Sequence, residues 1–290
     1  MPSTMTLLTA AMLSLATVAL AACNGQQALC DRPYSNVTFV GSHDSAFVGP
    51  LLVDNQLISV AKQLSLGVRF LQSQTHNKSG TIELCHTSCL EKDAGSLAAY
   101  LAPVKTFLDA NPDEVVTLLL TNGDAIPVAK FAEVFSAVGL AKYAFVPSGK
   151  LGLGAWPTLQ TMIDKGTRLV VWMDYHADTS SVPYILDEFS YYFETAYDVT
   201  DASFPSCAID RPSGASANGR MGIVNHMLHV EIFDIQIPNE VEAATTNSVK
   251  SIRAQAAICE GLYGRATNVV LLDYVNLGDA MGAQALLNGL

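Results

Sequence analysis

Short apolar runs that alternate with helical patterns extend along most of this chain. Eight such runs lie at 37–41, 68–75, 81–85, 115–120, 168–173, 191–196, 221–225 and 268–273. Helical patterns fall between several of them, at 56–66, 95–112, 156–159 and 246–259. Apolar runs of this length are typical of buried strands. Eight strands alternating with helices over about 250 residues predict an α/β fold, a distorted (β/α)8 barrel of the TIM type in a single domain, rather than an open doubly wound sheet.

The N-terminal residues have the composition of a secretory signal peptide. Residues 7–22 are all apolar or small, the run ends in Ala-Leu-Ala-Ala, and no Lys or Arg precedes it. A cleavage site of this kind predicts a signal peptide at 1–22, a mature barrel at 23–290 and a secreted, extracellular protein. The residues up to Cys23 also fit a bacterial lipoprotein box, although lipidation of Cys23 would leave an odd number of cysteines to pair. A transmembrane helix needs about 20 apolar residues, and no second long apolar run follows, so we expect no membrane-spanning segment.

The chain has six cysteines, an even number. In a secreted protein this favours three disulfide bonds. Six cysteines allow about 15 pairings, and our hypothesis joins consecutive ones: Cys23–Cys30, Cys85–Cys89 and Cys207–Cys259. A zinc site at Cys85 and Cys89 is less favoured, because no second pair follows at the spacing of zinc ligands. Asn36 and Asn77 begin N-glycosylation sequons, which predict a glycoprotein if the host is eukaryotic.

The charge balance excludes some classes of partner. The formal net charge is −11, and the 16 basic residues form no cluster. Nucleic-acid-binding surfaces need clustered Lys and Arg, so no nucleic-acid partner is expected. Electrostatic docking on an anionic membrane is disfavoured for the same reason. We expect a monomer.

Two histidines stand directly after two of the apolar runs. His43 follows 37–41, and His86 follows 81–85. Catalytic groups of barrel enzymes lie just past the carboxyl ends of the strands. Because imidazole titrates near neutral pH, one histidine can accept a proton while the other donates one. The sequence therefore predicts an acid–base pair at His43 and His86.

Common alternatives to this chemistry have no support in the sequence. The chain has no G-x-S-x-G, no P-loop, no H-E-x-x-H and no G-x-G-x-x-G. His226 and His229 have the spacing of metal ligands on a helix, but two histidines alone rarely make a site. We therefore expect neither a metal nor another cofactor.

The segments around the two histidines resemble a known family. The likeness continues, in order, through six segments: 40–44, 67–71, 84–86, 111–116, 225–226 and 271–274. Together they resemble the X region of phosphatidylinositol-specific phospholipase C, and most of all the secreted, fungal-type phospholipase C-like phosphodiesterases. The likeness covers most of the mature chain.

The resemblance implies a phosphoric diester hydrolase of lipid metabolism. His43 would be the general base that activates the inositol 2-hydroxyl, and His86 the general acid that protonates the departing oxygen. Asp44 and Asp273 match the family's supporting carboxylates, with Asp273 orienting His43. The substrate would be phosphatidylinositol or a related phosphodiester, with a soluble glycerophosphodiester as another possibility.

One departure from the family pattern concerns the charge on the phosphate, which must be neutralised in the transition state. Animal-type members use calcium held by a Glu-x-Asp pair, and bacterial members use an Arg at the second of these positions. This chain has Gln72 and Gln74 there, and neutral amides bind calcium poorly. Strand alternation puts His76 on the same face as Gln74 and Arg69 on the other. One hypothesis is that protonated His76 supplies the cation; an ordinary loop histidine is the alternative.

Other candidates follow the same strands. The candidate substrate-binding residues are Gln72, Gln74, His76, Asp174, Glu194, Tyr197 and Asn225. Residues placed like the last four are more often packing or capping residues than ligands. Tyr197 could stack on an inositol ring. A disulfide between Cys85 and Cys89 would hold the His86 loop rigid for catalysis, or would act only as a staple. A non-catalytic ligand-binding barrel and a metal-dependent sphingomyelinase-like lyase remain as rival functions.

Overall fold

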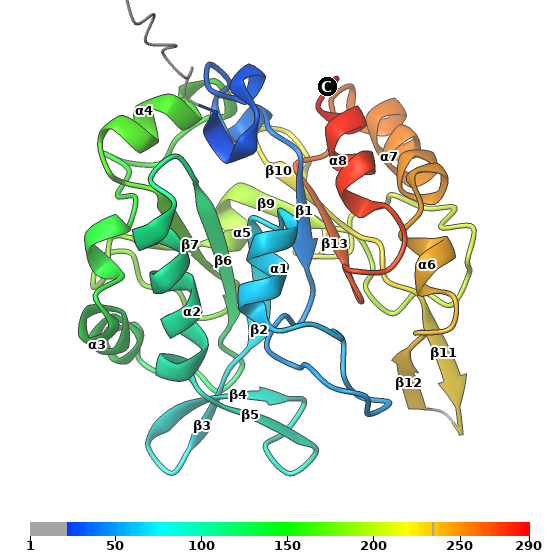
Figure 1. Cartoon of the computed structure of the whole chain (residues 1–290), viewed down its shortest axis with the longest axis horizontal. Coiled ribbons are helices and arrows are strands. Elements are labelled where there is room, and N and C mark those ends of the chain that lie inside the picture. The colour runs from blue at the N-terminus through cyan, green and yellow to red at the C-terminus, as the bar shows by residue number, and fades with distance from the viewer. Residues whose placement is uncertain (1–21, 234) are drawn as a thin grey trace, which may run out of the picture.

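The computed structural model describes residues 22–233 and 235–290 (Figure 1). Apart from Ala22, the expected signal peptide lies outside the described residues. An eight-stranded parallel sheet forms the centre, in the order β8-β7-β6-β2-β1-β13-β10-β9. Its strands are β1 (Phe39–Ser42), β2 (Phe70–Gln74), β6 (Val116–Thr121), β7 (Leu169–Met173), β8 (Ile185–Asp187), β9 (Tyr192–Glu194), β10 (Met221–Asn225) and β13 (Val269–Leu272). The order starts at β8 and ends at β9, so the curled sheet is an open, distorted barrel, and the predicted fold class is confirmed.

Helices pack on the outside of this sheet, as Figure 1 shows for α1, α2 and α8. They are α1 (Val60–Leu66), α2 (Leu97–Ala110), α3 (Val128–Val138), α4 (Leu159–Asp164), α5 (Glu188–Tyr191), α6 (Ala243–Thr246), α7 (Val249–Tyr263) and α8 (Ala280–Leu287). α2 begins where the sequence predicts, because the Ser96 side chain accepts a hydrogen bond from the backbone N–H of Ala99 and so caps the helix. None of the helices in the described part of the chain is long and apolar enough to cross a membrane.

The predicted strand at 81–85 forms, but outside the barrel. It is β4 (Thr81–His86), which pairs antiparallel with β3 (His76–Lys78) and β5 (Lys92–Ser96). Ser79 and Gly80 have φ values of 52° and 88°, as a tight hairpin turn requires. That turn reverses the chain after β3, so β4 pairs back on β3 and does not join the parallel barrel sheet. The three-residue strand β8 takes the eighth place instead.

A second small sheet, β11 (His229–Ile232) with β12 (Ile235–Pro238), is also antiparallel. Figure 1 shows this hairpin and the sheet β3–β4–β5 at the end of the barrel where the parallel strands finish. Five short 3₁₀ turns complete the fold: Cys23–Gly25, Gln27–Leu29, Tyr34–Asn36, Ala141–Tyr143 and Leu153–Ala155.

Strand alternation divides the buried residues between two cores. On β13, Val269 and Leu271 belong to a core inside the barrel together with Trp172, whereas Val270 and Leu272 pack with helix residues outside it. This is the two-residue period of a sheet that is covered on both faces. Polar residues at inward positions near the carboxyl ends therefore face one interior space.

All three predicted disulfide bonds are present. They join Cys23 to Cys30, Cys85 to Cys89, and Cys207 to Cys259. The first lies in the N-terminal segment, where both cysteines pack into the barrel core.

Candidate active site

His43 and Asp273 meet because they follow neighbouring parallel strands in register. β1 pairs with β13 so that Ser42 lies opposite Leu272, which makes His43 and Asp273 the next residue of each strand. Nδ1 of His43 lies 2.8 Å from Oδ1 of Asp273. The same oxygen accepts a hydrogen bond of 3.0 Å from Nδ2 of Asn55. Asp273 therefore orients the imidazole, and Nε2 of His43 faces Asp44.

Asp44 is a fully buried carboxylate that lies between the two histidines. Its Oδ2 is 3.5 Å from Nε2 of His43 and 3.6 Å from Nε2 of His86. The backbone of Asp44 has a φ of 41°, a left-handed conformation that aspartate adopts more readily than most residues. The structure thus brings His43, Asp44, His86 and Asp273 into one cluster.

Gln72 and Gln74, at the end of β2, hold Asp44 in place. The backbone N–H of Asp44 donates to Oε1 of Gln72 at 2.7 Å, and Nε2 of Gln74 donates to Oδ2 of Asp44 at 2.8 Å. Oε1 of Gln74 accepts a hydrogen bond of 3.0 Å from the N–H of Thr87, in the loop that carries His86. Both side-chain amides therefore bind Asp44, the carboxylate beside His43 and His86.

This arrangement does not fit the calcium site of animal-type relatives. Calcium prefers several carboxylate oxygens, and Gln72 and Gln74 offer amide groups that already bind Asp44. Among the described residues, no group of three or more His, Cys, Asp or Glu side chains could hold a metal ion.

His86 ends β4 and is fixed from several sides. The disulfide between Cys85 and Cys89 closes its loop, and its ring meets the edge of Phe47 with the centroids 5.2 Å apart. Nδ1 of His86 lies 3.4 Å from Oε1 of Glu91 and has no hydrogen-bond partner among the described atoms. The Nε2 side, which faces Asp44, is therefore the side that looks into the site.

The carboxylates change the proton affinity of His43. Burial alone would lower its pKa, but the charges of Asp44 and Asp273 outweigh burial and raise the pKa of His43 to about 9. At neutral pH the resting imidazole is thus protonated. It must lose this proton before it can act as a base.

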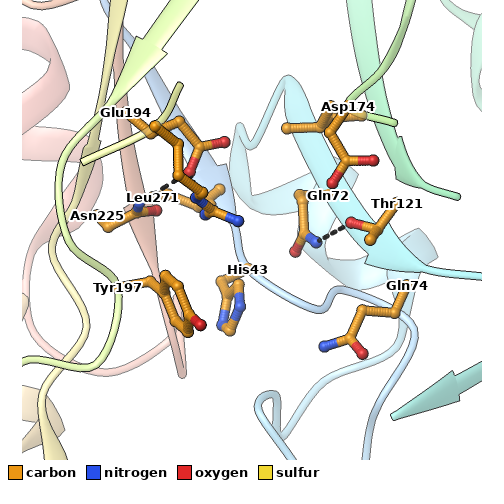
Figure 2. A pocket seen from close by; sticks show the side chains of 11 residues that line it. His43, Gln72, Gln74, Thr121, Asp174, Glu194, Tyr197, Asn225 and Leu271 are labelled. Carbon is orange, nitrogen blue, oxygen red and sulfur yellow. Dashed lines mark hydrogen bonds and ion pairs between the residues drawn. The ribbon is translucent and has the colours of Figure 1, made fainter. Parts of the chain in front are cut away.

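His43 also lines a cavity of about 190 Å³ (Figure 2). This is smaller than the roughly 300–1,000 Å³ of pockets for drug-sized ligands, so it has room only for a small ligand. Six of the seven predicted substrate-binding residues line it: Gln72, Gln74, Asp174, Glu194, Tyr197 and Asn225. Burial raises the pKa of Asp174 to about 6, with hydrogen bonds from Thr121 and a backbone N–H opposing the shift.

The seventh candidate, His76, does not line the cavity and pairs with Asp124, so its role as the cation stays a prediction. Nδ1 of His76 lies 3.1 Å from Oδ1 of Asp124, and His76 does not line the cavity. The reason is that β2 ends at Gln74 and a new strand, β3, begins at His76. The alternation that put Gln74 and His76 on one face is therefore broken between them.

The sequence interpretation missed Arg211, which lines the same cavity. Its guanidinium pairs with the carboxylate of Glu194, and its Cζ lies 4.6 Å from the ring centroid of Tyr197. Asn225 donates to the same Glu194 oxygen at 3.0 Å. Arg211 lies in the long β9–β10 connection, where neither periodicity nor a motif could have singled it out.

His226 is not a metal ligand in this arrangement. Its Nδ1 lies 2.6 Å from Oε1 of Gln255 and its Nε2 lies 2.9 Å from the carbonyl oxygen of Thr246. Burial lowers the pKa of His226, so it acts as a neutral core residue.

Sequence comparison decides the family. The family model described as PI-PLC X 1 matches residues 29–288. The chain belongs to the PI-PLC X family. Its relatives include "PI-PLC X domain-containing protein 1" of Arthroderma benhamiae, which is 52% identical over 92% of this chain and 90% of that protein. An "uncharacterized secreted protein" of the same fungus is 42% identical, over 90% of this chain and 62% of the relative.

Solved structures support the same fold for this PI-PLC X chain. Phosphatidylinositol-specific phospholipase C from Listeria monocytogenes superimposes with a TM-score of 0.56 over 90% of this chain and 95% of that one, at 12% identity. The F249X mutant of the Staphylococcus aureus enzyme gives 0.56 at 16% identity, over 89% and 94% of the two chains. Identities this low show that the barrel is shared, and they say nothing further about chemistry.

Proposed function

We propose that this PI-PLC X protein is a secreted phosphoric diester hydrolase that cleaves phosphatidylinositol or a related phosphodiester without a metal cofactor. The observation that carries the proposal is the placement of one buried carboxylate, Asp44, beside Nε2 of both His43 and His86. Two imidazoles that face the same point can serve both ends of one phosphodiester.

The proposed reaction divides the proton transfers between the two histidines. His43 takes the proton of a head-group hydroxyl as its oxygen forms a bond to phosphorus. The bond from phosphorus to the departing alkoxide breaks, and His86 gives its proton to that oxygen. Because the attacking hydroxyl belongs to the head group, this step leaves a cyclic phosphodiester. The roles of His43 and His86 reverse when water opens this ring. Asp273 and Asp44 keep the rings oriented through both steps.

Exposed apolar side chains near the site favour a lipid-linked substrate over a soluble one. Leu52 is 70% exposed and Leu90 is fully exposed. They lie on the β1–α1 loop and the β4–β5 connection, which Figure 1 shows at the end of the barrel where the parallel strands finish. The two connections are joined by an ion pair of 2.6 Å between Lys92 and Asp54.

An extracellular location is part of the proposal. One relative is described as a secreted protein, and three disulfide bonds are typical of oxidising compartments. A signal peptide at 1–22 would direct this chain there, and the mature protein would act as a monomer.

An assay with two substrates tests the proposed activity. Phosphatidylinositol in phosphatidylcholine vesicles and soluble glycerophosphoinositol would be offered to the wild type and to the His43→Ala and His86→Ala variants, with and without EDTA. We expect cleavage of the lipid that EDTA does not change, and losses of about 10²–10⁴-fold in each variant. His76→Ala is the matched control, because His76 lies outside the cavity, and it should retain full activity.

The same assay separates an enzyme from a binding protein. A ligand-binding barrel is the second candidate for two reasons. Gln72 and Gln74 are neutral amides at the positions where family members balance the phosphate charge, and His43 is protonated at rest. If neither substrate is cleaved by the wild type while inositol phosphates still bind, the protein is a binding protein. EDTA-sensitive cleavage would contradict the metal-independent mechanism.

A further inference from the structure

We propose that Arg211 binds the phosphate of the substrate and balances the negative charge that develops on it during cleavage. This inference rests on the proposed function, because it assumes that a phosphodiester enters the cavity beside His43. Charge that builds up on the non-bridging oxygens needs a fixed cation. The two strand-end amides are occupied, since both hold Asp44.

The backbone around Arg211 is fixed to the barrel. Arg211 and Glu194, the last residue of β9, form an antiparallel bridge. The N–H of Glu194 donates to the carbonyl oxygen of Arg211 at 2.8 Å, and the N–H of Arg211 donates back at 3.2 Å. A residue of a long loop is thereby placed as reproducibly as a strand residue, which a charge-stabilising group requires.

Its side chain contacts Glu194, Tyr197 and Tyr175, and its Nε lies 4.0 Å from Oδ2 of Asp210. Nη2 of Arg211 pairs with Oε2 of Glu194, and the guanidinium lies over the ring of Tyr197. The Glu194 side chain is 4% exposed, whereas that of Arg211 is 28% exposed. The Glu194 carboxylate therefore lies behind the guanidinium. The guanidinium has exposed surface and further N–H groups that can donate to an oxyanion.

Two other cations, Arg69 and Lys92, are paired and do not line the cavity. Arg69, on the preceding turn into β2, donates from Nε to Glu114 at 2.6 Å and lies outside the cavity. Lys92 pairs with Asp54. Among the residues that line the cavity, Arg211 is the one arginine or lysine.

Arg211 supplies positive charge in this proposal and takes no part in proton transfer. While the attacking oxygen bonds to phosphorus and the leaving oxygen departs, His43 and His86 move the protons, and Arg211 keeps all of its own. It donates hydrogen bonds to the non-bridging oxygens, which become more negative as the reaction proceeds. Arginine suits this contact because its planar fork matches two phosphate oxygens.

Direct binding measurements test the contact without relying on turnover. Isothermal titration calorimetry would compare inorganic phosphate, myo-inositol 1-phosphate and uncharged myo-inositol on the wild type and on Arg211→Gln. We expect Arg211→Gln to weaken both phosphate ligands about tenfold or more, the value of a charge-assisted hydrogen bond, and to change inositol affinity less than about twofold. Equal weakening of all three ligands would show that Arg211 shapes the cavity or binds the ring, which overturns the proposal.

Two further variants guard against a purely structural effect. Glu194→Gln keeps the shape behind Arg211 but removes the compensating charge, so phosphate should bind as tightly as in the wild type or more tightly. If Glu194→Gln loses phosphate as Arg211→Gln does, the pair is structural and the proposal fails. Arg220→Gln is the matched control, because Arg220 lies in the same connection and bonds to backbone carbonyls outside the cavity.

The outcomes also separate this inference from the proposed function. Phosphate binding that depends on Arg211, in a protein that cleaves neither substrate, would leave the inference intact and refute the enzyme. Cleavage that survives Arg211→Gln with kcat within about twofold of the wild type would refute Arg211 as the charge-balancing group and leave the enzyme intact. If the wild type binds neither phosphate ligand, the inference fails.

Discussion

His43 lies between two carboxylates, and they set the pH at which it can act. Its pKa is raised to about 9 because the charges of Asp44 and Asp273 outweigh the effect of burial. A general base must be unprotonated, and the pH dependence of kcat/KM reports the free enzyme. We therefore expect kcat/KM to rise about tenfold per pH unit below neutrality and to level off near pH 9, measured on phosphatidylinositol vesicles from pH 5 to 10.

The variant Asp273→Asn provides the control for this profile. It removes one of the charges that raise the pKa of His43, so the rising limb should move to lower pH even as the plateau falls. If the rising limb of kcat/KM stays at the same pH in this variant, a group other than His43 titrates there.

The side-chain amide of Gln74 holds Asp44, and a charge at this position should disturb the site. Gln74→Glu would put a carboxylate where Nε2 of Gln74 now donates to Oδ2 of Asp44 at 2.8 Å. Repulsion should displace Asp44 from the two histidines and lower kcat about tenfold or more, since small misplacements of catalytic groups are costly. Added calcium should not restore the rate, because Gln72 remains an amide. Calcium-dependent recovery, followed in the same vesicle assay, would contradict this role.

The residues that sequence could reveal are those tied to strand ends. His43 and Asp273 each follow a strand of the parallel sheet directly, so their meeting follows from register. Arg211 comes from a connection with no periodic pattern, and only its bridge to Glu194 brings it to the cavity. His76 does not line the cavity because the chain leaves the barrel sheet after Gln74.

At the scale of elements, two of the disulfides should differ in what they do. Cys85 and Cys89 are 4 residues apart, and Cys207 and Cys259 are 52 apart. Loop-closure entropy gives about 2 kcal/mol for the short loop and about 4 kcal/mol for the long one. We expect replacing Cys85 and Cys89 with Ser to cost less stability, but to lower kcat more, because that loop carries His86.

Urea denaturation and the vesicle assay on both double variants check this contrast. The Cys207→Ser/Cys259→Ser protein is the reference, since its disulfide joins the β9–β10 connection to α7 and does not close the loop that carries His86. If the Cys85→Ser/Cys89→Ser protein keeps its full kcat, the short disulfide only stabilises the fold and does not position His86.

Local patterns explain which elements were predictable. The capping serine and the apolar face of α2 are sequence signals, and the helix begins where they predict. The strand β4 has the composition of a barrel strand, and only the turn at Ser79 and Gly80 reveals that it belongs to a hairpin. The strand β8 is three residues long, too short for its pattern to be distinguished from a loop.

At the scale of the whole molecule, the inward face of the barrel changes character along its axis. Near the amino ends of the strands it is packed with large side chains such as Phe39 and Tyr192, which belong to one core with the N-terminal cysteines. Near the carboxyl ends it carries Gln74, Glu194 and Asn225. The closed end supplies the stability, which allows the open end to hold several buried charged groups close together.

The stability of the protein should depend on the charge of His43 with a definite sign. A histidine whose pKa is raised from 6.5 to about 9 on folding binds its proton more tightly in the folded state. Its contribution is fully present below pH 6.5 and is lost as the pH rises through 9. From the size of the shift it amounts to about 3 kcal/mol at most.

Urea unfolding of the wild type and of His43→Gln, at pH 6 and at pH 9.5, measures this contribution. His43→Gln should be less stable at pH 6, and the gap between the two proteins should narrow at pH 9.5, whereas the control His76→Gln should follow the wild type at both. Because the proposed mechanism needs the base form of His43, activity and folding stability should then change in opposite directions across the same pH window. A gap that is constant with pH would mean that His43 is not protonated in the resting site, and the rising limb of kcat/KM should then lie well below pH 9.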